Sequence, residues 1–201
     1  MYLENINGPS DIQKLNLDEL RILADETRDA LIHKISLAGG HNGPNLGMVE
    51  VTTALHYVFH SPIDKFVFDV SHQSYPHKIL TGRKQAFLDE EHFHDVTGYT
   101  NPEESEHDFF TIGHTSTSIS LALGLAKGRD LNHGKENIIA IIGDGSLSGG
   151  EALEALDYAG EYRNNLIIIV NDNDQSIAEN HGGLYKNLKE LRESIGNCTN
   201  N

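Results

Sequence analysis

The stretch that decides the fold is Asn137-Ile138-Ile139-Ala140-Ile141-Ile142-Gly143-Asp144-Gly145, an apolar run that ends in an aspartate between two glycines. A second apolar run, Leu166 to Val170, is separated from the first by a segment with helical spacing and is followed by Asn171-Asp172-Asn173. Strands that are apolar throughout and alternate with helices are typical of a parallel sheet that is covered on both faces. The sequence therefore predicts an α/β fold in which a parallel sheet carries helices on both faces.

Outward from this centre, the spacing of apolar residues predicts the other main elements. Helices are expected at about residues 17–37, 48–59, 119–129 and 151–162, and further strands at 66–70 and 109–112. Glycine and proline between residues 39 and 44 predict a turn after the first helix. The charged, histidine-rich segment 86–106 is expected to form a surface excursion, and the residues after Leu191 are expected to start a loop.

Composition narrows the classes of function. The chain has 201 residues, enough for one sizeable domain, and its 30 acidic against 15 basic residues give a net charge of -15. Such a chain should repel nucleic-acid backbones and anionic lipid, so neither partner is expected. Cys198 is the single cysteine, which excludes an internal disulfide. Neither a signal-peptide pattern nor a membrane-spanning apolar run is visible, so a cytoplasmic location is expected.

Polar residues follow the ends of the two central strands. Asp144 and Asn173 are 29 positions apart, and ligands of open α/β sheets bind beyond the carboxyl ends of the strands. A carboxylate and an amide oxygen, completed by phosphate oxygens and water, suit octahedral Mg²⁺. Gly143 and Gly145 would let the backbone approach a diphosphate closely, and the helix opened by Ser146 would direct amides at negative charge. Each motif alone could be an ordinary turn, but the pair across one βαβ unit favours a site.

Three further segments carry a family resemblance. Asp69-Val70-Ser71-His72-Gln73-Ser74-Tyr75-Pro76-His77-Lys78-Ile79-Leu80-Thr81-Gly82-Arg83 is the most specific, and Gly113 to Ser120 and Gly40-His41 with Asn45-Leu46-Gly47 accompany it. Together they resemble the 1-deoxy-D-xylulose-5-phosphate synthase family of transketolase-like thiamine diphosphate enzymes, in the right order from about residue 30 to residue 183. The resemblance implies a thiamine diphosphate-binding fold and identifies the chain with the N-terminal domain, which binds the cofactor's diphosphate.

The resemblance also implies site residues. Mg²⁺ would be bound by Asp144, Asn173 and the backbone carbonyl of Gln175. The cofactor would be bound by His72 and, at its diphosphate, by Gly113, His114, Thr115, Gly145, Ser146 and Asn173. His41, His72 and His114 would line the cavity and take part in catalysis, because imidazole exchanges protons near neutral pH. His77 is expected either to support the residues that line the site or to be structural. The tract Glu90 to Asp95 is expected to be a solvated loop and not a metal site.

The sequence departs from the family in places. Ser71 stands where the family usually has glycine, Asn42-Gly43-Pro44 leans toward the transketolase version of the first histidine motif, and Asp174-Gln175 replaces a segment that typically carries methionine. These departures leave the cofactor prediction intact and bear on the choice of substrate.

Family enzymes have three domains, and residues 1–201 match the first. The aminopyrimidine-binding and C-terminal domains are expected to lie outside this sequence, so the chain is expected to be a fragment, a split subunit or a truncated gene product, and inactive alone. The intact enzyme, expected to be a homodimer, would condense pyruvate with D-glyceraldehyde 3-phosphate to 1-deoxy-D-xylulose 5-phosphate and CO₂, for isoprenoid and thiamine biosynthesis. The alternatives are transketolase-type ketol transfer and a non-catalytic cofactor-binding module.

Overall fold

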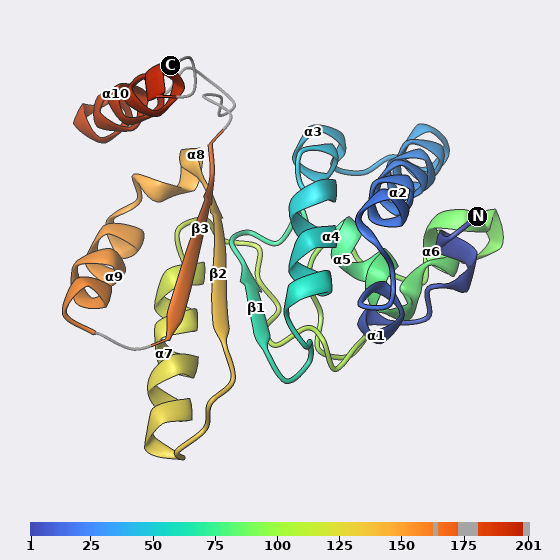
Figure 1. Ribbon diagram of the computed structural model, residues 1–201, viewed down its shortest axis with the longest axis horizontal. Coiled ribbons are helices and arrows are strands. Elements are labelled where there is room, and N and C mark those ends of the chain that lie inside the picture. Colours follow the sequence, from blue (N-terminus) through green and yellow to red (C-terminus); the bar gives the residue numbers. More distant parts are fainter. Residues whose placement is uncertain (163–164, 173–180, 199–201) are drawn as a thin grey trace.

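A parallel sheet lies at the centre of the molecule (Figure 1). The computed structural model describes residues 1–162, 165–172 and 181–198. Its three strands are β1 (Lys65–Phe68), β2 (Ile138–Gly143) and β3 (Leu166–Asn171), in the order β1-β2-β3. Gly143 pairs with Asn171, so β2 and β3 end at the same level. The residues that follow these two strands therefore leave the sheet at one edge.

Helices cover both faces of this sheet, because alternate strand residues point to opposite sides. On one face Val67 and Ala140 join the core formed with α7 (Ser118–Leu131) and α9 (Gly150–Glu161). On the other face Phe68 and Ile141 pack with residues of α4 (Val49–Val58) and the methionine before it. Figure 1 shows the sheet between these layers. The prediction of an α/β fold with helices on both faces is confirmed.

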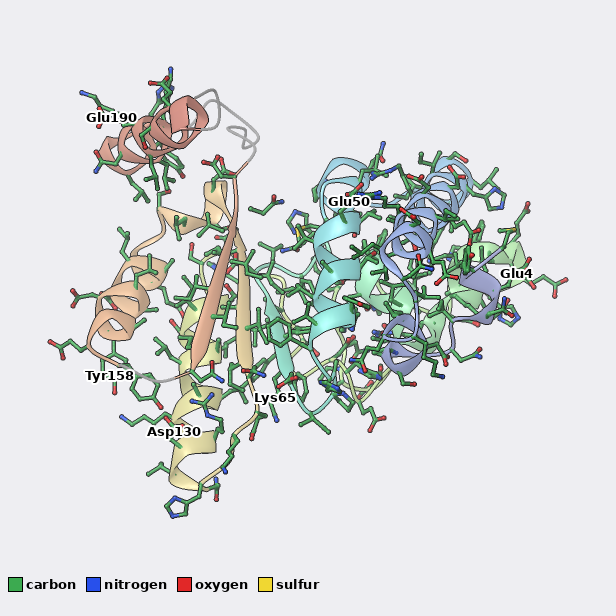
Figure 2. The ribbon with its side chains drawn as sticks, in the orientation of Figure 1. Glu4, Glu50, Lys65, Asp130, Tyr158 and Glu190 are labelled. Atoms are coloured by element: carbon green, nitrogen blue, oxygen red, sulfur yellow. The ribbon has the colours of Figure 1, made fainter. Side chains whose placement is uncertain are left out.

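A further helical layer lies beyond α4. Its main element is α2 (Leu17–Ala38), whose first turn is closed by a capping box between Asn16 and Glu19. Leu23 and Leu31 of α2 are fully buried in a second core with Phe87. Figure 2 shows the side chains that fill the space between these ribbons. The remaining short elements are η1 (Leu3–Asn5), α1 (Pro9–Ile12), α3 (Asn42–Leu46), α5 (Tyr75–Lys78), η2 (Ile79–Arg83), α6 (Gln85–Leu88), η3 (Glu90–His92) and α8 (Asp144–Leu147), and the last helix is α10 (Gly183–Cys198).

Three expectations about local structure were wrong. Residues 109–112 form no strand, because side chains and not a neighbouring strand bind their carbonyl groups. Thr100 Oγ1 donates to the carbonyl of Phe110 at 2.8 Å, and Ser71 Oγ donates to that of Ile112 at 2.9 Å. Segment 86–106 is not wholly a surface excursion, since Phe93 is 5% exposed in the interior. The residues after Leu191 continue α10 to Cys198.

No helix in the described ranges is long and apolar enough to cross a membrane.

Candidate functional site

Two of the predicted histidines lie side by side. The ring centroids of His41 and His72 are 5.4 Å apart, with their planes at 84°. His41 immediately precedes α3, after Gly39 and Gly40 turn the chain with φ angles of 75° and 136°. A Cβ atom at Gly40 would lie 2.9 Å from the hydroxyl oxygen of Tyr75, so this close approach requires glycine.

One buried amide joins the two histidine loops. The side-chain nitrogen of Asn45 donates to the carbonyl oxygens of His41 at 2.6 Å and His72 at 2.8 Å. Its side-chain oxygen accepts from the backbone N–H of Tyr75 at 2.8 Å. Asn45 is fully buried. A single side chain therefore ties together the backbones that carry the two imidazoles.

The environment favours the neutral form of His72. Burial lowers the pKa of His72, nearby His41 lowers it further, and Asp69 opposes the shift. Among the described residues, the Nδ1 atoms of His41 and His72 are buried and have no hydrogen-bond partner. A neutral imidazole has one donor and one acceptor nitrogen, so these two Nδ1 atoms are hydrogen-bonding groups that the described part of the chain leaves unused.

Asp69 links this pair to a second site segment. Its carboxylate follows β1, is 1% exposed, and accepts from the backbone N–H groups of Ser116 at 2.9 Å and Ser118 at 3.0 Å. It thereby fixes the turn before α7, on which the predicted cofactor residues Gly113, His114 and Thr115 are exposed.

His114 is placed differently from the other two histidines. Its Nδ1 lies 2.8 Å from the carbonyl oxygen of Thr115 in the same turn. Within the described ranges, no ring contact joins His114 to His41 or His72. The structure thus brings two of the three predicted histidines together, and the convergence of the third remains a prediction.

The turn after β2 contacts the turn before α7. Ser116 Oγ donates to the carbonyl oxygen of Ser146 at 2.7 Å. Asp144 is 3% exposed at the start of α8, and Gly145 beside it is exposed. The space that a Cβ atom at Gly113 would occupy is open. Two open turns at one sheet edge, beside a buried carboxylate, fit a metal-bound diphosphate.

The predicted metal ligands cannot all be placed. Asn173 and Gln175 lie outside the described residues, so their role beside Asp144 remains a prediction. No group of three or more His, Cys, Asp and Glu side chains in the described ranges could hold a metal ion. A site with one carboxylate, one amide and one backbone carbonyl would not form such a group.

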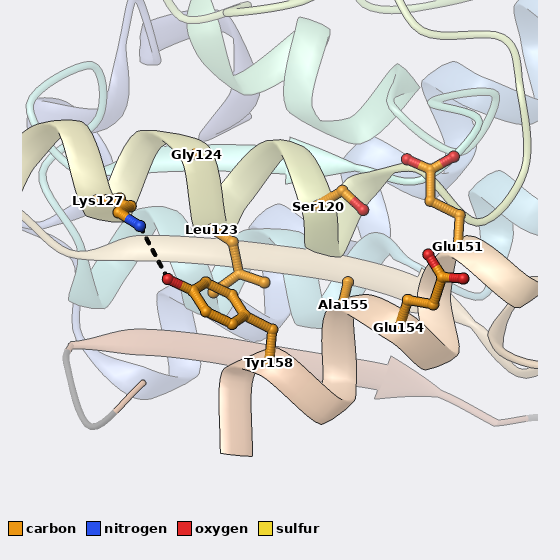
Figure 3. A pocket seen from close by; sticks show the side chains of 8 residues that line it. All are labelled: Ser120, Leu123, Gly124, Lys127, Glu151, Glu154, Ala155 and Tyr158. Carbon is orange, nitrogen blue, oxygen red and sulfur yellow. Dashed lines mark hydrogen bonds between the residues drawn. The ribbon is translucent and has the colours of Figure 1, made fainter. Parts of the chain in front are cut away.

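A groove between α7 and α9 lies outside this constellation (Figure 3). Its volume is about 320 Å³, and Lys127 Nζ donates to the Tyr158 hydroxyl at 2.9 Å across it. Its lining residues are Ser120, Leu123, Gly124, Lys127, Glu151, Glu154, Ala155 and Tyr158. None of them is a predicted site residue.

Comparison with known proteins decides the family. The family model described as 1-deoxy-D-xylulose-5-phosphate synthase matches residues 3–198. The chain belongs to the 1-deoxy-D-xylulose-5-phosphate synthase family. It is 50% identical over 190 residues to the enzyme of that name from Caldanaerobacter subterraneus subsp. tengcongensis, covering 94% of this chain and 30% of that protein. The synthase from Halalkalibacterium halodurans is 51% identical over 192 residues, covering 96% and 30%. The chain thus spans about 30% of the length of these synthases.

Solved structures agree on the fold. Transketolase from Campylobacter jejuni superposes with a TM-score of 0.71 at 20% identity, over 88% of this chain and 32% of that one. Transketolase from Leishmania mexicana gives 0.64 at 22% identity, over 79% and 28%. The expected resemblance to the synthase family and to transketolase-like folds is confirmed.

Three residues of the site had no role assigned from the sequence of this synthase family member. Asn45 and Asp69 lie in the family-like segments, and they hold the backbones of the histidine loops and of the turn before α7. Tyr99 lies in the segment expected to be a surface excursion, yet its ring centroid is 5.5 Å from that of His41. In the sequence, Tyr99 could have been noticed as an aromatic residue that directly follows a glycine, Gly98.

Proposed function

We propose that the chain is the cofactor diphosphate-binding domain of a thiamine diphosphate- and Mg²⁺-dependent 1-deoxy-D-xylulose-5-phosphate synthase. The enzyme would condense pyruvate with D-glyceraldehyde 3-phosphate, releasing CO₂. The observation that carries the proposal is the contact between the turns at Ser116 and Ser146, beside Asp144 and next to the Asp69 loop, in a chain of this family. The product would enter isoprenoid biosynthesis.

The chain's residues have separable tasks in this proposal. Amides of the Gly113-His114-Thr115 turn, with Gly145 and Ser146, would bind the diphosphate. Asp144, Asn173 and Gln175 would hold Mg²⁺. When bound, thiamine diphosphate supplies the electron sink for the carbanion. His72 with its lowered pKa, and His41 beside it, would hold and move protons on the substrate oxygen.

The rest of the enzyme lies outside this chain in the proposal. An aminopyrimidine-binding domain or subunit would complete the cleft, the assembly would be a homodimer, and the location would be the cytoplasm. Transketolase-type ketol transfer is the second candidate. It has weaker support, since the solved transketolases are 20% and 22% identical, against 50% and 51% for the synthases.

Calorimetric titration of the complete enzyme with thiamine diphosphate and Mg²⁺ tests cofactor binding. Asp144→Ala, and Asp144→Asn as the milder change, should weaken binding at least about 100-fold, because the buried carboxylate balances metal charge. Asp157→Ala, at an exposed position on α9, is the control and should bind like the wild type. Equal affinity of a folded Asp144→Ala protein would sink the metal-site assignment.

The substrate assignment needs a separate assay on the complete enzyme. Pyruvate is offered as donor with D-glyceraldehyde 3-phosphate, and xylulose 5-phosphate is offered with a five-carbon aldose phosphate, because transfer of its two-carbon unit to D-glyceraldehyde 3-phosphate would only regenerate the donor. CO₂ and the ketose product are measured in both assays. Turnover of pyruvate supports the synthase. Turnover of xylulose 5-phosphate without release of CO₂ would establish the transketolase alternative.

A further inference from the structure

The segment Thr97–Asn101, here called the Tyr99 loop, forms a wall of the histidine pair. The rings of Tyr99 and His41 meet at 61° with centroids 5.5 Å apart. A Cβ atom at Gly98 would lie 3.5 Å from Cε1 of His41, so the backbone of the loop also lies against this ring. Tyr99 is 37% exposed, which leaves part of its ring accessible from the site.

Buried side chains hold the backbone of the Tyr99 loop. The N–H of Thr97 donates to Glu104 Oε1 at 2.7 Å, and the N–H of Asn101 donates to Asp108 Oδ2 at 2.8 Å. The side chains of Glu104 and Asp108 are 11% and 0% exposed. Tyr99 therefore stands between two backbone positions that carboxylates fix.

Cationic side chains compensate both carboxylates. Arg83 makes a bidentate contact with Asp108 at 2.7 and 3.0 Å, and Nε2 of His77 lies 3.0 Å from the same carboxylate. Glu104 forms ion pairs with Lys78 and, at 3.3 Å, with Arg83. His77, Lys78 and Arg83 all come from the Asp69–Arg83 stretch. These five residues are called the buried ionic cluster below.

The two carboxylates of the cluster are ionised within the fold. Burial raises the pKa of Asp108, but hydrogen bonds from His77 and Arg83 outweigh it and hold the pKa well below the ordinary value. Burial also raises the pKa of Glu104, but hydrogen bonds from Lys78 and Thr97 outweigh it and lower this pKa below the ordinary value. Buried ion pairs are weak evidence for stability, because desolvation offsets most of their attraction. The shared structural effect of Glu104 and Asp108 is to fix the Tyr99 loop.

We propose that Glu104 and Asp108 are positioning residues that hold the Tyr99 loop against His41. Tyr99 then restrains the His41 imidazole and narrows the site for a small oxygen-bearing substrate. The inference rests on the proposed function only where it assumes that His41 moves protons on the substrate oxygen. The contact itself can be tested without any catalytic assay.

The first test is ¹H–¹³C NMR on protein labelled at histidine and tyrosine. Glu104→Gln keeps the length of the side chain but removes the charge that binds Lys78, so the ion pair no longer holds the side chain where it accepts from the N–H of Thr97. We expect loss of the cross-relaxation signal between the Tyr99 ring and Hε1 of His41. Glu103→Gln changes the same charge at the neighbouring exposed position, and it should keep the signal. A folded Glu104→Gln protein that keeps this signal would overturn the proposal.

The second test uses Tyr99→Leu, which remains decisive if Glu104→Gln does not fold. Because Tyr99 is partly exposed, this change leaves the cores intact. The Hε1 resonance of His41 should shift, and kcat of the complete enzyme should fall roughly tenfold with little change in KM, as expected when a reacting group is misplaced. An unchanged His41 resonance contradicts the inference. A complete enzyme that is inactive even as wild type contradicts the proposed function instead, and the NMR result still decides the positioning role.

Discussion

The side-chain nitrogen of Asn45 lies 2.8 Å from the backbone carbonyl oxygen of His72. The same amide also binds the loop of His41, so Asn45→Ala would leave two carbonyl groups and one N–H without their partner. Each unsatisfied buried group costs about 1–3 kcal/mol, and we expect a loss of about 3 kcal/mol in the free energy of unfolding. Looser loops would also hydrate His72, so its pKa should rise toward the ordinary value.

Urea unfolding and histidine NMR titration measure these two effects. Asn42→Ala is the control, because Asn42 belongs to the same short helix and is exposed. It should change stability by less than about 0.5 kcal/mol. If Asn45→Ala and Asn42→Ala were equally stable, Asn45 could not be the link between the loops.

Ser71 shows how a departure from the family is accommodated. Its φ of 66° lies in the left-handed region, where a side chain costs about 1–2 kcal/mol. In return, its hydroxyl accepts from the N–H of Thr100 at 3.0 Å and donates to the carbonyl of Ile112 at 2.9 Å. Ser71→Ala keeps the strain and loses both bonds, so we expect a loss of about 2 kcal/mol.

Ser71→Gly loses the same bonds but relieves the backbone strain, so it should be within about 1 kcal/mol of the wild type. Thermal unfolding of the two variants gives the order directly. An alanine variant that is more stable than the glycine variant would show that the strain or the hydrogen bonds were wrongly assigned.

The same contacts explain what the sequence could and could not predict. β2 and β3 were predictable because each is a continuous apolar run, which is visible in the sequence without knowledge of distant contacts. Segment 109–112 is also mostly apolar, but Thr100 and the distant Ser71 bind its carbonyl groups, and a local pattern does not contain that information. The charges around Glu104 suggested a solvated surface, whereas Glu104 itself is paired with Lys78 in the interior. Composition records that a charge is present, not that it has a buried partner.

Lys34 is a buried cation that should cost stability near neutral pH. Its Nζ lies 4.2 Å from the ring centroid of Phe87. Burial lowers the pKa of Lys34 to about 8, the charge of Lys78 lowers it further, and Glu104 and Asp95 oppose the shift. The rings of Tyr75 and Phe93 also face this ammonium group. A pKa below that of the unfolded chain means that protonation favours unfolding.

Lys34→Met should therefore raise the free energy of unfolding by about 1 kcal/mol at pH 7, a net gain that already includes the loss of the cation–π contact. This gain corresponds to a rise of about 2–4 °C in the melting temperature. The advantage should be largest below pH 8 and shrink as pH rises to 10.5, where the unfolded lysine also loses its proton. Lys127→Met, an exposed lysine over Tyr158, is the control and should give no gain. A pH-independent difference between Lys34→Met and the wild type would contradict this account.

Gly149 and Ser116 leave no room for a side chain between the two turns of the proposed diphosphate site. A Cβ atom at Gly149 would lie 1.9 Å from Oγ and 2.6 Å from Cβ of Ser116. The backbone of Gly149, with φ of -66° and ψ of 144°, would otherwise accept alanine. Gly149→Ala should thus cost about 2–3 kcal/mol purely by overlap with Ser116. In the complete enzyme it should also weaken thiamine diphosphate binding, because it moves one turn away from the other.

A double-mutant cycle isolates this overlap. Ser116→Gly alone loses the hydrogen bond to Ser146 but relieves a φ of 71°, so its own cost should be about 1 kcal/mol or less. In that background Gly149→Ala should be nearly neutral, which gives a coupling of about 2 kcal/mol between the two positions. Gly160→Ala, which meets no atom within 4 Å on α9, should instead stabilise the helix slightly. If Gly149→Ala were equally costly with and without the Ser116 side chain, the two turns could not be packed against each other as described.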